Sequence, residues 1–105
     1  MSTLVIHAPY EKVQIENKRS FQNTFASSIG DEYAIPRLFI PLIPPGCKVV
    51  LLSKDEEKRA EGKLVKLVAR SKTNTGMQRY DVHIENLRMV PYKPEALLRT
   101  GIAII

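Results

Sequence analysis

The sequence lacks several residue types that define common protein classes. Its 105 residues include no tryptophan and only one cysteine, Cys47, so an intrachain disulfide is impossible. The two histidines, His7 and His83, lie too far apart in sequence to give a zinc-ligand spacing. We therefore expect no metal and no other cofactor, and the lone cysteine indicates a reducing compartment.

Long apolar runs are also missing. None approaches the roughly 18 residues of a membrane span, so we expect no membrane partner. Residues 1–7 contain neither a basic segment nor a long apolar segment, the two features typical of a signal peptide. The expected location is the cytoplasm.

The sequence contains no arrangement typical of an enzyme. The GxGxxG, Walker and GxSxG motifs are absent. The acidic triplet at residues 55–57 lies in a polar stretch, where solvent prevents the separation of pKa values that acid–base catalysis needs. His83 lies between Asp81 and Glu85, but no nucleophile is near it in sequence. We therefore assign no catalytic residue and favour a binding protein over an enzyme.

Acidic residues are absent from one stretch of the chain. The formal net charge is +5, which admits a polyanionic partner. Residues 62–80 carry five cations and no acid, whereas the other 11 cations balance the 11 acids. The whole excess charge therefore lies in this window. An alternative interpretation is that these cations protect an edge strand or cover a solvated face.

Hydrophobic patterning predicts short strands and one short helix. The expected strands cover residues 3–8, 47–53, 62–70, 79–85, 87–90 and 101–105, with a further extended piece at 11–16. Phe21, Phe25 and Ile29 repeat at helical spacing, which predicts a helix over residues 20–29. Ser20 is its expected N-cap, and Gly30 its expected C′ residue.

The segments between these elements have turn and loop composition. Residues 34–46 hold four of the seven prolines and predict a buried connection with at most one helical turn. Residues 54–61 predict an exposed loop, and residues 71–78 a hairpin loop with Gly76 at positive φ. Residues 95–99 allow one helical turn. We expect a single domain over 1–105, mainly β with minor α: a small barrel of five to seven strands with one or two short helices.

The basic window predicts a nucleic-acid interface. Its strand–loop–strand pattern brings two strands within about 5 Å, so that cations from both can share one surface and contact phosphates. We expect the partner to be nucleic acid, RNA in the first place, although the cations alone separate neither RNA from DNA nor a nucleic acid from an acidic protein. The expected contact residues are Lys63, Lys66, Arg70, Lys72, Asn74 and Arg79.

Three segments resemble a known superfamily. PGCKVVLL at residues 45–52 resembles the P-G-D-x-V-x-h-h entry to the central strand of PUA-like domains, which include the PUA, ASCH and EVE families. AEGKLVKLV at 60–68 and RYDVHIENL at 79–87 are similar to their next two strands. The resemblance spans about residues 44–92 and implies a PUA-like pseudobarrel with a groove for RNA or modified bases. Cys47 stands where the family has an acidic residue, and the tryptophans of EVE-type pockets are absent.

Two other functions remain open. A protein-interaction module, including a homodimer, would use the apolar Pro-rich segment 35–46 and the apolar C-terminus at Ile102, Ile104 and Ile105. An enzyme acting on a nucleotide or RNA would need a pocket that gathers Arg37, Tyr80, Asp81 and His83.

Overall fold

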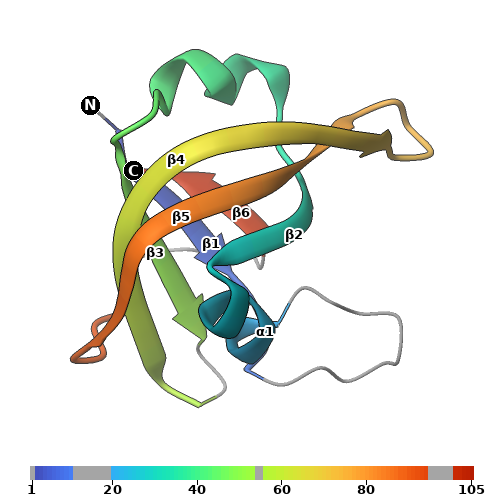
Figure 1. Cartoon of the computed structure of the whole chain (residues 1–105). Coiled ribbons are helices and arrows are strands. Elements are labelled where there is room, and N and C mark those ends of the chain that lie inside the picture. Colours follow the sequence, from blue (N-terminus) through green and yellow to red (C-terminus); the bar gives the residue numbers. More distant parts are fainter. Residues whose placement is uncertain (1, 11–19, 54–55, 95–100) are drawn as a thin grey trace.

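The computed structural model describes residues 2–10, 20–53, 56–94 and 101–105. One six-stranded sheet, in the order β2-β5-β4-β3-β1-β6, curls into a half-barrel (Figure 1). Two short helices accompany it, α1 (Phe21–Ser27) and the 3-10 helix η1 (Arg37–Leu42). The expectation of a small, mainly β pseudobarrel is confirmed. The strands are β1 (Leu4–His7), β2 (Ile29–Ala34), β3 (Lys48–Ser53), β4 (Lys58–Lys72), β5 (Gln78–Val90) and β6 (Gly101–Ile104).

The long hairpin of β4 and β5 forms the spine of the sheet. Its strands have 15 and 13 residues, and their pairing is interrupted by three register shifts. Such bulges bend a strand pair and increase its twist, which is why the hairpin arches over the rest of the molecule in Figure 1. One end of β4 pairs with β3, while β5 carries β2 on its other side.

The central strands β1 and β3 pair in parallel and are buried on both faces. Leu4, Ile6 and Leu51 pack into the main core, whereas Val5 and Val50 belong to a second cluster. Burial on both faces explains why these strands are continuous apolar runs in the sequence. The predicted strands at 3–8 and 47–53 are confirmed. Cys47, just before β3, is only 1% exposed, and burial raises the pKa of its thiol.

Helix α1 begins where the sequence predicts and ends earlier. The Ser20 hydroxyl accepts a hydrogen bond from the Asn23 amide at 3.1 Å, as an N-cap does. Phe21 stacks between Tyr10 and Phe25 and is buried. The prediction that Gly30 ends the helix is wrong, because Ser28 adopts the left-handed conformation (φ 60°) and its amide donates to Thr24.

Gly30 instead lies within β2, which begins at Ile29. A methyl carbon at this position would lie 3.1 Å from the ring of Tyr33. Glycine is therefore favoured here by close packing, and not by the helix end.

The Pro-rich connection differs from its prediction. Residues 37–42 form a six-residue 3-10 helix with no buried side chain, rather than a buried segment with at most one turn. Leu38 is 84% exposed, and only the flanking Ile35 and Ile43 are buried. Pro36 and Pro41 remove backbone donors, so the segment forms short i→i+3 turns at the rim of the half-barrel.

Two strand boundaries also differ from the prediction. Residues 58–61 belong to β4 and not to a loop, because Lys58 and Arg59 continue the pairing with Ser53 and Leu52. The expected strands at 79–85 and 87–90 form one strand, β5, in which Asn86 adopts a positive φ of 54°. The hairpin loop is confirmed, with Gly76 at φ 86°.

The predicted last strand is also confirmed as β6, antiparallel to β1. Its Ile102 and Ile104 are partly buried against the core. The predictions for residues 11–16 and 95–99 fall outside the described part of the chain. Within that part, no helix combines the length and apolarity needed to cross a membrane.

The close approach of β4 and β5 at Gly62 gives a stability prediction. A methyl carbon there would lie 2.7 Å from both the Glu85 carbonyl oxygen and Cγ2 of Ile84. We expect Gly62→Ala to lower the free energy of unfolding by about 3 kcal/mol, measured by urea denaturation. The control is Gly76→Ala, which meets only open space at a positive φ and should cost about 1 kcal/mol. Equal losses in both variants would contradict the assignment.

Candidate nucleic-acid interface

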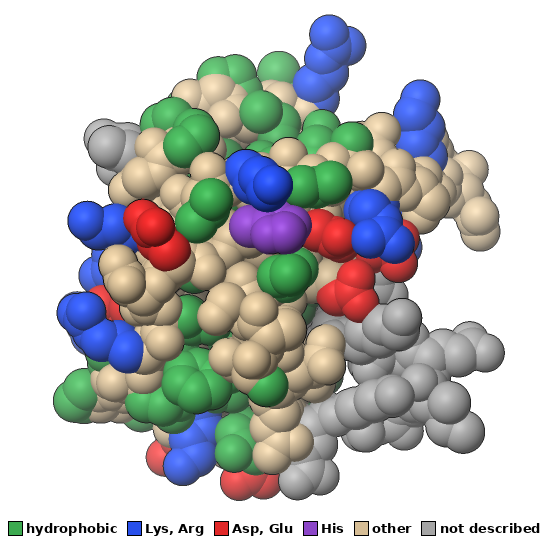
Figure 2. Space-filling model, in the orientation of Figure 1, with side chains coloured by type: hydrophobic (Ala, Val, Ile, Leu, Met, Phe, Trp, Pro, Cys, Tyr) green, Lys and Arg blue, Asp and Glu red, His purple; other side chains and the backbone are tan. Residues whose placement is uncertain are grey.

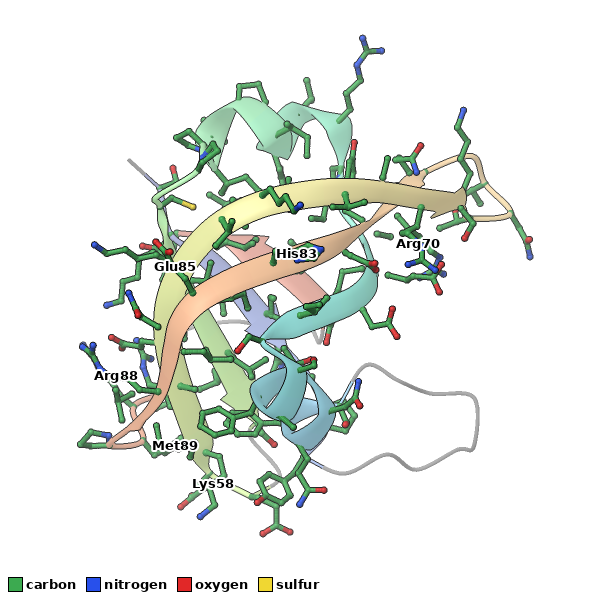
Figure 3. All side chains as sticks on the ribbon, viewed as in Figure 1. Lys58, Arg70, His83, Glu85, Arg88 and Met89 are labelled. Atoms are coloured by element: carbon green, nitrogen blue, oxygen red, sulfur yellow. The ribbon has the colours of Figure 1, made fainter. Side chains whose placement is uncertain are left out.

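Two bulges place charged residues on the same face of the β4–β5 hairpin. Lys63 pairs with Glu85 and Lys66 with His83. His83 and Glu85 are alternate residues of β5 and therefore share a face. Their partners Lys66 and Lys63 lie on the same face, although they are three residues apart in β4. At the register shift between Glu61 and Lys63 the extra residue lies in β5, because Glu61 pairs with Arg88 and Lys63 with Glu85. Arg88 therefore lies on the same face as Glu85, although the two are three residues apart (Figure 3). We call this side of the hairpin the outer face.

A hollow of about 390 Å³ opens on the outer face. We call it the basic groove. It is lined by Gly46, Lys48, Glu61, Gly62, Lys63, Asn86 and Arg88. Lys48 of β3 lies directly opposite Lys63 of β4, and like charges in this position destabilise a sheet. A bound anion would relieve that repulsion.

Glu61 partly neutralises the groove. Its two carboxylate oxygens lie 3.3 Å from Lys48 Nζ and 2.9 Å from Arg59 Nε. Partial burial raises the pKa of Glu61, but the hydrogen bonds and charges of Arg59 and Lys48 outweigh it, so that the pKa lies below its ordinary value. Glu61 is therefore ionised at neutral pH. Among the described residues, Lys63 and Arg88 have no ion pair of their own.

Two of the expected contact residues stabilise the fold. Arg70 forms an ion pair with Asp81 at 2.7 Å, and Asp81 also accepts the Glu32 amide at 3.1 Å. Arg79 donates to the Glu32 carbonyl oxygen at 3.0 Å. Arg79 thus bonds β5 directly to β2, whereas Arg70 holds Asp81, which in turn accepts from β2. The charge of Arg70 is already partly compensated. The mixture of signs is visible in Figure 2, where basic and acidic side chains alternate around the central histidine.

The remaining expected residues lie at the tip of the hairpin. Lys72 pairs with Gln78, which shares the face of Tyr80. Lys72 therefore lies on the side of the hairpin opposite the outer face, which we call the inner side, and borders a different hollow. Asn74 is exposed in the loop. By register, Lys72 therefore lies apart from the other four cations of residues 62–80, which lie on the outer face: Lys63, Lys66, Arg70 and Arg79.

Sequence reasoning missed Lys48 and Arg88. Both lie outside the acid-free window, and each reaches the groove through strand register that the sequence does not display. The four residues that an enzyme would need in one pocket are also separated. Arg37 and Tyr80 border the hollow at the tip, whereas Asp81 and His83 lie on the outer face. Within the described residues, no three His, Cys, Asp or Glu side chains are grouped to hold a metal ion.

Comparisons with known proteins do not assign this chain to a family. No protein-family model, curated protein or solved structure matches it. Its function is therefore inferred from the side chains that the fold brings together.

The ionised Glu61 gives a prediction about pH. Its lowered pKa stabilises the fold above the ordinary value of 4.5, and this contribution is lost as the pH falls through the lowered value. Glu61→Gln removes the charged partner of Arg59 Nε, and Arg59 is only 5% exposed. We expect it to cost about 2 kcal/mol at pH 7.

The measurement is urea denaturation of both proteins at pH 7 and pH 3. The difference between them should be smaller at pH 3, because the stabilisation by the ionised Glu61 carboxylate is lost as the pH falls toward its lowered pKa. An equal difference at both pH values would contradict this electrostatic role.

Proposed function

We propose that the protein is a non-catalytic RNA-binding module that holds the phosphate backbone on the outer face of its β4–β5 hairpin. The observation that supports this most directly is the arrangement of Lys63, Lys66 and Arg88. Two bulges bring them to one face beside Lys48, and none of the three has an ion pair among the described residues. We call Lys48, Lys63, Lys66 and Arg88 the outer basic set.

The spacing of this set suits an extended polyanion. Neighbouring strands lie about 4.8 Å apart, and alternate residues along a strand about 6.6 Å apart, so the cations form a two-dimensional array rather than a single row. Phosphates that bind such an array release counterions, and this release supplies most of the affinity of nucleic-acid binding at low salt. Arg88 adds a guanidinium that can hold one phosphate through two parallel hydrogen bonds.

RNA is favoured over DNA for two reasons. The exposed carboxylate of Glu85 lies opposite Lys63, where it can accept a hydrogen bond from a 2′-hydroxyl that DNA lacks. The resemblance of residues 44–92 to PUA-like domains points the same way, and we propose that the chain is a member of that superfamily. A cytoplasmic location is part of the same proposal, since the only cysteine is buried and unpaired.

A second candidate function is self-association through η1. Leu38 and Leu42 are 84% and 48% exposed there, and apolar side chains at a rim favour a protein contact. Sedimentation velocity distinguishes the two functions, because a dimer interface would be weakened by Leu38→Asp with Leu42→Asp while RNA binding through the outer basic set would remain.

The test of RNA binding is charge reversal on the outer face. We expect Lys63→Glu with Lys66→Glu to weaken binding of a fluorescein-labelled RNA hairpin at least about tenfold. The slope of the logarithm of the binding constant against the logarithm of salt concentration should fall by the equivalent of about two phosphate contacts. Fluorescence anisotropy at several salt concentrations measures both quantities, and the same sequence as DNA tests the preference for ribose.

The matched control is Lys58→Glu with Lys93→Glu, which changes the charge equally at two exposed lysines outside the groove. This control should weaken binding far less. Equal losses in both double variants, or binding that does not respond to salt, would overturn the proposal.

A further inference from the structure

A second hollow, of about 690 Å³, lies between η1 and the tip of the β4–β5 hairpin. We call it the tip hollow. Its walls are held by backbone bonds: the Ile35 amide donates to the Gln78 carbonyl oxygen at 3.3 Å, which attaches the start of η1 to β5. Ile35 itself is buried beneath it. The volume is in the range of small-ligand sites, so it suits one nucleotide-sized group rather than a duplex.

The charged residues of the tip hollow all have one sign. Arg37 of η1 and Lys72 of β4 line it, and no carboxylate does. Among the described residues neither cation has an ion pair. Glu32, which is close to the tip, accepts a hydrogen bond from Ser71 and does not line the hollow. This differs from the basic groove, where Glu61 compensates part of the charge, and it favours an anionic ligand group.

The remaining wall is apolar and aromatic. Leu38 is 84% exposed and Met77 40% exposed, while Tyr80 is half-buried and packs against the core. All three line the hollow. A flat ring placed against them would remove apolar surface from water, and stacking of a base on an aromatic side chain contributes about 1–3 kcal/mol.

The tip is preorganised for such a ligand. The Met77 amide donates to the Thr73 hydroxyl at 3.0 Å, and the Thr73 amide donates to the Met77 carbonyl oxygen at 2.8 Å. The Gln78 side-chain amide donates to the carbonyl oxygens of Arg70 and Arg79. These bonds fix the loop before binding, so little conformational entropy is lost when a ligand enters.

From this combination we infer that the tip hollow binds a nucleoside monophosphate unit. Arg37 and Lys72 contact the phosphate, and the base lies against Leu38, Met77 and Tyr80. The unit is either a free mononucleotide or an unpaired nucleotide of a single strand, which share this chemistry. The inference stands apart from the RNA backbone contacts proposed for the outer face, because the two sets of residues do not overlap.

The test is an NMR titration of the full chain with adenosine 5′-monophosphate, adenosine and inorganic phosphate. We expect shifts at Arg37, Leu38, Lys72 and Tyr80 with the monophosphate, and at least about tenfold weaker binding of the two fragments. Arg37→Gln with Lys72→Gln should weaken monophosphate binding about tenfold, whereas Lys58→Gln with Lys93→Gln, at two exposed lysines that line neither the basic groove nor the tip hollow, should leave it unchanged. Leu38→Ala, at a position that is 84% exposed, should weaken monophosphate binding and leave the free energy of unfolding unchanged.

A single-stranded RNA oligomer distinguishes the two sources. If it displaces the monophosphate at lower concentration than the free nucleotide does, the ligand is a nucleotide within a strand; if it does not compete, the ligand is a free mononucleotide. The inference is overturned if neither the monophosphate nor the RNA oligomer shifts the NMR signals of the residues that line the tip hollow. It is also overturned if inorganic phosphate binds as tightly as the monophosphate. It is also overturned if the glutamine variant at Arg37 and Lys72 binds as wild type does. The charge reversal at Lys63 and Lys66 tests only the outer-face proposal, and neither of its outcomes bears on the tip hollow.

Discussion

The irregular pairing of β4 with β5 is the constraint on which the rest of the structure depends. These two strands are long enough to span the whole molecule, and a regular ladder of that length would leave the sheet too open to enclose a core. The register shifts bend the hairpin, and Gly62 lets the backbone of β5 approach where any side chain would collide. The curled hairpin can then pair with β3 at one end and carry β2 at its other side.

The same bulges decide where the charge lies. In a regular strand, Lys63 and Lys66 would lie on opposite faces, and so would Glu85 and Arg88. The extra residues bring each pair to one side, which creates a groove with cations from three strands. Near the tip, a further shift puts Lys72 on the inner side, beside Arg37 of η1. One structural device therefore separates the basic residues into two sites with different walls.

Net charge is a poor guide to a binding surface because some cations serve the fold. Arg59 is buried and held by Glu61. Arg70 pairs with Asp81, and Arg79 binds the backbone at Glu32. The bonds at Asp81 and Arg79 add to the backbone pairing that already joins β2 to β5. What remains for a ligand is a smaller set, formed by Lys63, Lys66 and Arg88 on the outer face and by Arg37 and Lys72 at the tip.

The sequence by itself determined the fold class, the strands β1, β3 and β6, the N-cap of α1 and the hairpin with its Gly76 turn. Apolar runs, alternation and capping residues act locally, and tertiary contacts did not override them at these positions. Only the tertiary structure decided which side chains line the basic groove and the tip hollow. Lys48 reaches the groove through pairing with β4, and Arg88 through a bulge at Asn86. Arg37 reaches the tip hollow because η1 borders it together with the hairpin tip. Each depends on register between distant segments, because a one-residue shift in pairing moves every side chain to the other face.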